Sequence, residues 1–84
     1  MSVDKVRKDV DSIDDKILQL LNDRAKASQK IGKIKIKSGQ GIYSPEREKE
    51  ILDRLKAKNK GPITPSAIEA IYREVMSKIG RAHV

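Results

Sequence analysis

"VDKVRKDVDSIDDKILQLLNDRAKASQKIGKIKI", residues 3–36, is the stretch that decides the fold. Its apolar residues recur at alternating steps of three and four, the spacing of one face of a continuous α-helix. The members of this series, called the seam below, are Val3, Val6, Val10, Ile13, Ile17, Leu20, Ala27, Ile31 and Ile34. The pattern predicts a single long amphipathic helix. One position in the series, between Leu20 and Ala27, is occupied by Arg24.

Two shorter helices are expected after a glycine-containing loop. Ser44 and the proline after it are typical of a helix start, so a second helix is predicted over residues 45–59, ending before Gly61. Thr64 and Pro65 repeat this start for a third helix. The second helix is expected to bury Ile51, Leu52 and Leu55, and the third is expected to carry Ile68, Ile71, Tyr72, Val75 and Met76 on one face. The sequence therefore predicts an all-α fold of one long and two shorter helices.

The length of the first helix predicts the oligomeric state. A helix over residues 3–36 is about 50 Å long at roughly 1.5 Å per residue. A compact chain of 84 residues is only about 30 Å across. The helix overhangs such a globule, and its seam needs a partner, so we expect an intertwined homodimer with the long helices paired.

Composition narrows the possible partners. Nineteen Lys and Arg against twelve Asp and Glu give a net charge of +7, which favours anionic ligands. The chain has no cysteine and one histidine, so no metal site is expected. Neither an apolar run long enough to cross a membrane nor a signal-peptide pattern occurs, so we expect a cytoplasmic protein without membrane contact.

Arg24 has two interpretations. It can be a structural arginine, held in an ion pair or lifting its head to water. Alternatively, its guanidinium awaits an anionic ligand, because an unpaired charge in a dry seam is costly. Lys35 lies about three turns further along the same stripe, and Ser28 borders it. Antiparallel pairing of two long helices would bring Arg7 of one chain toward Arg24 and Lys35 of the other.

The start of the second helix supplies further polar groups. Arg47 and Glu48 occupy its first turn in "SPEREKEIL", and a helix N-terminus is a favourable place for anions. Several cations with one carboxylate suit a small dianion that carries a hydroxyl group.

Three stretches together resemble a known family: "VRKDVDSIDDKILQLLNDRAKASQKIGKIK", "YSPEREKEIL" and "AIYREVM". They are similar to the all-helical chorismate mutases, small intertwined dimers that convert chorismate to prephenate in aromatic amino-acid biosynthesis. The resemblance covers residues 3–77 and implies a mutase domain over residues 1–78. It also implies an enzyme without cofactor or metal, and without nucleic acid as a partner.

The resemblance implies a role for each polar residue. Arg24 resembles the main carboxylate-binding arginine, and Arg7 the arginine that the other subunit contributes. Lys35 resembles the lysine that donates to the ether oxygen of the breaking bond. Glu48 resembles the carboxylate that accepts from the ring hydroxyl, and Arg47 a second arginine of the pocket.

Other positions depart from the family. Ser44 stands where some members carry aspartate, so it either contacts substrate or only caps the helix. In "KIGRAHV", Ile79 and His83 stand where the family presents a serine and a glutamine or glutamate. "IGRAHV" resembles a translated sequencing adapter. We interpret residues 79–84 as a foreign or frayed tail and expect the natural gene to continue, as in family members fused to another enzyme of the aromatic pathway. His83 is then a terminal residue without function, or alternatively a replacement donor to the ether oxygen.

Two functions without catalysis stay open. The same pocket could serve a ligand-binding or regulatory module. The positive charge could also serve a nucleic-acid-binding helical dimer, although the acids of both early helices interrupt the basic surface and only Tyr43 and Tyr72 could stack on bases.

Overall fold

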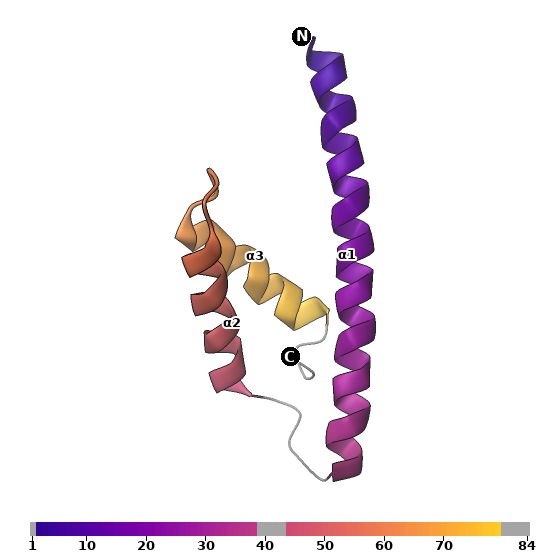
Figure 1. The fold of residues 1–84 in the computed structure, drawn as a ribbon, viewed down its shortest axis with the longest axis vertical. Coiled ribbons are helices and arrows are strands. Elements are labelled where there is room, and N and C mark those ends of the chain that lie inside the picture. Colours follow the sequence, from indigo (N-terminus) through magenta and orange to yellow (C-terminus); the bar gives the residue numbers. More distant parts are fainter. Residues whose placement is uncertain (1, 39–43, 80–84) are drawn as a thin grey trace.

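The computed structural model describes residues 2–38 and 44–79, together with the side chains of these residues other than 35–38. It contains three helices, α1 (Val3–Ser38), α2 (Pro45–Lys58) and α3 (Pro65–Lys78) (Figure 1). Within the described ranges no residue is in a strand. The prediction of an all-α chain with one long and two shorter helices is confirmed.

The long helix α1 stands beside a hairpin made of α2 and α3 (Figure 1). It continues two residues past the predicted end, to Ser38. The chain measures 55 × 23 × 17 Å, and its radius of gyration is 15.7 Å. A compact domain of this length has a radius of gyration of about 12 Å. The excess confirms that α1 extends well beyond the rest of the chain.

The core lies between α2 and α3. Ile51 and Leu52 of α2 pack against Met76 of α3, and Leu55 and Tyr72 cover the edges of this cluster. These residues recur at helical spacing on each element, so one stripe of each helix faces the other. Ile71, predicted to lie on the same face of α3, is 51% exposed in the single chain.

Both short helices begin where the sequence predicts. The Ser44 hydroxyl accepts a hydrogen bond from the backbone N–H of Arg47 at 3.2 Å, and the Thr64 hydroxyl accepts one from Ala67 at 3.1 Å. Each hydroxyl satisfies a backbone donor that the first helical turn leaves unpaired. The end of α2 differs from the prediction. The helix ends at Lys58, one residue earlier than predicted, and Asn59 caps it in an extended conformation.

The seam of α1 is open to solvent in a single chain. Its valines, isoleucines and leucine are between 38% (Ile31) and 66% (Val3) exposed. Such a continuous exposed apolar stripe is unusual for a helix that has all its partners. In the described part of the chain, no helix is both long and apolar enough to cross a membrane.

Candidate functional site

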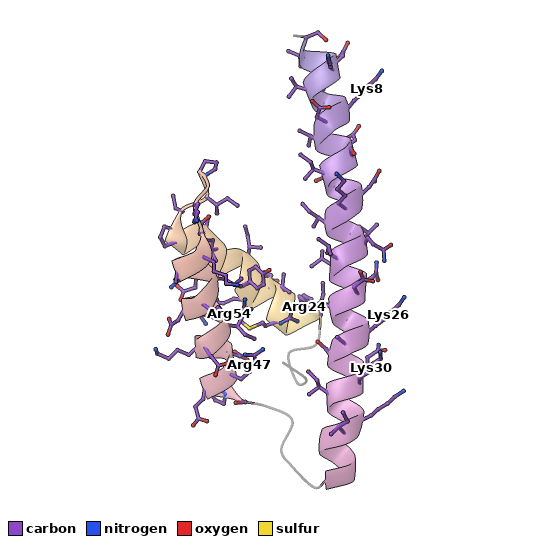
Figure 2. The ribbon with its side chains drawn as sticks, in the orientation of Figure 1. Lys8, Arg24, Lys26, Lys30, Arg47 and Arg54 are labelled. Atoms are coloured by element: carbon purple, nitrogen blue, oxygen red, sulfur yellow. The ribbon has the colours of Figure 1, made fainter. Side chains whose placement is uncertain are left out.

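Arg24 is held at the junction of α1 and α3. Its half-buried side chain reaches toward the end of α3 (Figure 2), where Nη1 donates a hydrogen bond to the main-chain oxygen of Ile79 at 3.0 Å. Ile79 caps the C-terminus of α3, the end of a helix that carries partial negative charge. Among the described residues, no carboxylate forms an ion pair with Arg24. The interpretation of Arg24 as a member of a structural ion pair is therefore not supported by these residues. Its partner is the main-chain carbonyl of Ile79.

Ser28 lies one turn further along α1 and is 4% exposed. It borders a groove of about 390 Å³ between α1 and the end of α3. The other residues lining this groove are Leu18, Leu21, Asn22, Ala25, Gln29, Lys78 and Ile79. Ser28 and Ile79, the hydrogen-bond partner of Arg24, thus line the same groove.

Glu48 lies in α2 and faces α3. Its Oε2 atom is shielded from solvent. The side chain lines a groove of about 220 Å³ whose other members include Arg73 and Ser77 of α3. The sequence had not indicated Arg73 or Ser77 as neighbours of Glu48. Their spacing of four residues places them on one helix face, which was the available signal.

In the single chain, Arg47 forms an ion pair within α2 and Ser44 caps the start of that helix. Nη1 of Arg47 lies 2.6 Å from Oε1 of Glu50, one turn along the helix. Ser44 caps α2, as one of its two interpretations expected. Whether either side chain also meets a ligand stays a prediction.

Arg7 lies far from Arg24 within one chain. The two are separated by about 25 Å along α1 at roughly 1.5 Å per residue. The Arg7 side chain is 76% exposed, with Nη1 3.9 Å from a carboxylate oxygen of Asp4. One chain alone does not bring Arg7 to the other candidate residues.

Two predicted residues fall outside what the structure describes. The backbone of Lys35 belongs to the last turns of α1, on the stripe of Arg24, but its side chain is not described. His83 lies outside the described residues altogether.

A group of charged residues joins α2 to α3 beside a third groove. This groove of about 410 Å³ is also lined by Glu48. On its wall Lys56 and Arg73 both contact the carboxylate of Glu69, at 3.4 and 3.3 Å. The hydrogen bond from Lys56 is the main cause that lowers the pKa of Glu69, and Arg73 adds to it.

Comparison with known proteins identifies relatives over nearly the whole chain. The family model for chorismate mutase type II matches residues 6–83. A bifunctional chorismate mutase/prephenate dehydratase from Aquifex aeolicus is 44% identical over 77 residues, which cover 87% of this chain and 21% of that protein. A chorismate mutase from Methanocaldococcus jannaschii is 42% identical over 52 residues, which cover 62% of this chain and 52% of that protein.

The fold has solved counterparts as well. A chorismate mutase from Thermus thermophilus (form I) superimposes with a TM-score of 0.88 and 35% identity, covering 89% of this chain and 94% of that one. The chain spans only about a fifth of the length of the bifunctional relatives that it matches.

Proposed function

Because this chain belongs to the chorismate mutase type II family, we propose that it catalyses the rearrangement of chorismate to prephenate. The reaction is intramolecular: a carbon–oxygen ether bond breaks while a carbon–carbon bond forms, and no group leaves. It needs no nucleophile and no cofactor. What accelerates it is restriction of the substrate to its compact reactive conformer and positive charge near the ether oxygen.

The observation that carries this proposal is the position of Arg24. Its half-buried guanidinium is bonded to the carbonyl of Ile79, which lines a groove, and to no acid among the described residues, so it keeps its full positive charge for an anion. We assign Arg24 to a substrate carboxylate, Lys35 to the ether oxygen and Glu48 to the ring hydroxyl. We assign Arg47 to the same pocket.

We further propose that the working unit is a homodimer with antiparallel α1 helices. The exposed seam supports this, because a second copy would cover it. The same pairing would carry Arg7 of one subunit toward Arg24 of the other. We place the enzyme in the cytoplasm, in aromatic amino-acid biosynthesis. The bifunctional relatives support a natural fusion to a further enzyme of that pathway.

The test is the loss of chorismate ultraviolet absorbance after addition of the purified protein. We expect a rate well above the spontaneous one. Arg24→Ala should abolish saturation by substrate, whereas Lys26→Ala, an exposed neighbour that points away from α3 (Figure 2), should not. Binding of chorismate without turnover would instead indicate a ligand-binding module. Salt-dependent retention on DNA without turnover would indicate a nucleic-acid binder.

A further inference from the structure

The bond between Arg24 and Ile79 joins two segments that are 55 residues apart in sequence. The position of the acceptor oxygen at the end of α3 explains why it can accept a bond from Arg24. The backbone N–H of Ile79 makes the final helical bond, to the oxygen of Val75 at 2.7 Å. Its own carbonyl belongs to the last turn, where a helix leaves oxygens without helical donors. A guanidinium is a strong donor for such an oxygen and also complements the negative end of the helix.

The atom that makes this bond determines which part of Arg24 is left for a ligand. The guanidinium is planar and has five N–H groups in a fixed arrangement. With Nη1 turned to Ile79, the edge formed by Nε and Nη2 remains as a parallel pair of donors. This edge matches a carboxylate, which accepts two parallel hydrogen bonds from it.

We propose that the main-chain carbonyl of Ile79 is a positioning group for Arg24, fixing Nη1 so that the Nε–Nη2 edge receives a substrate carboxylate. This inference rests on the proposed function, since it assumes that Arg24 binds such a carboxylate. The physical gain is preorganisation. A free arginine side chain loses much rotational freedom when it binds a ligand, and a side chain already held at one end loses less.

The acceptor is a backbone atom, so the contact needs no particular side chain at position 79 and is compatible with the interpretation of residues 79–84 as a foreign tail. It depends on α3 ending at Lys78, which leaves the next carbonyl near Arg24. The opposite effect would follow if Arg24 had to leave Ile79 in order to bind substrate. The carbonyl would then compete with the ligand. Positioning and competition change the KM for chorismate in opposite directions, so one experiment distinguishes them.

The experiment replaces one peptide bond by an ester in the chemically synthesised full-length chain. An ester between Ile79 and Gly80 weakens the Ile79 carbonyl as an acceptor and keeps every side chain. The matched control is an ester between Asn59 and Lys60, because Asn59 is the corresponding cap of α2 and its backbone N–H likewise makes the last helical bond. We expect the first ester to raise KM about threefold to tenfold with kcat nearly unchanged, as for partial loss of a hydrogen bond to a charged group. The control should leave both constants as in the parent chain.

A second readout does not depend on activity. In ¹⁵N NMR spectra, a guanidinium held at Nη1 rotates slowly and gives separate Nη signals, whereas a free one gives an averaged signal. We expect separate signals for Arg24 in the parent and control chains and an averaged signal in the Ile79 ester. A lower KM in that ester, an unchanged KM, or the same increase in both esters would overturn the positioning role. An inactive parent chain with separate Nη signals would overturn the proposed function and leave the contact established.

Discussion

The ammonium of Lys56 on α2 lies 3.4 Å from the carboxylate of Glu69 on α3, and Arg73 approaches the same oxygen to 3.3 Å. Glu69 thereby links the two arms of the hairpin that contains the core. The pairs Arg47–Glu50 and Lys49–Asp53, by contrast, each lie within α2.

Glu69→Gln should loosen the hairpin. The amide keeps the size of the side chain but loses the charge that both cations contact, so we expect the melting temperature to fall by a few degrees, as for exposed ion pairs. Circular dichroism at 222 nm measures this. The control is Glu74→Gln on the same helix, an exposed glutamate that forms no ion pair with another described residue, which should melt like the parent protein. Equal melting of all three proteins would contradict the link.

The contacts of Glu69 with Lys56 and Arg73 also predict how the stability of the fold depends on pH. The folded state lowers the pKa of Glu69 below its ordinary value of 4.5, so the folded chain binds its proton less readily than the unfolded chain. The stability gained from Glu69 is therefore fully present above pH 4.5 and is lost as pH falls through the lowered pKa. The melting curves of the parent and of Glu69→Gln should differ at neutral pH and converge in acid. A constant difference down to the acid limit would argue against this cause.

Variants of Ser44 distinguish a role in helix capping from a role in substrate contact. Ser44→Ala removes the acceptor for the Arg47 N–H and should cost about 0.5–2 kcal/mol in the free energy of unfolding. Ser44→Asp keeps an acceptor and should retain stability. Urea denaturation and the KM for chorismate are measured on both variants. If Ser44 only caps α2, the KM should stay constant in both. A raised KM in the alanine variant alone would add substrate contact to its role.

The seam predicts that a charge introduced at two adjacent positions of α1 affects dimerisation very differently. Ile13→Asp places a charge on the seam, whereas Ser12→Asp places the same charge on the neighbouring, solvent-facing side. Sedimentation equilibrium should show dimers for the parent and Ser12→Asp and a shift toward monomers for Ile13→Asp, because a buried unpaired charge is costly. Dimers of undiminished affinity in Ile13→Asp would place the interface elsewhere.

Lys35→Ala should lower kcat by about 10²–10³-fold or more, as when one donor to a developing negative charge is removed. Lys33→Ala removes an equal charge two residues away, on an exposed part of α1, and should leave kcat unchanged. Both variants should melt like the parent protein. Near-normal turnover in Lys35→Ala would remove it from the proposed role.

Local signals account for how well the helices could be predicted. Ser44 and Thr64 act within one turn of themselves, so their capping bonds could be recognised in the sequence alone. The seam likewise depends only on spacing along one helix. Periodicity indicates which residues share a face but not what that face contacts, so the 51% exposure of Ile71 in the single chain could not be predicted from its spacing.

The parts of the site that depend on packing could not be predicted in the same way. The bond from Arg24 to Ile79 depends on where α3 ends relative to α1, and the placement of Arg73 and Glu48 on one groove depends on how α3 crosses α2. Neither relation follows from residue type or short-range spacing.

The hairpin buries only four apolar side chains, those of Ile51, Leu52, Ile68 and Met76, while α1 leaves its apolar side in water. So small an interior supplies little free energy against the entropy of ordering the chain. If a second copy covers α1, folding and association become a single reaction. The protein should then unfold on dilution, and its midpoint of thermal denaturation should rise with concentration.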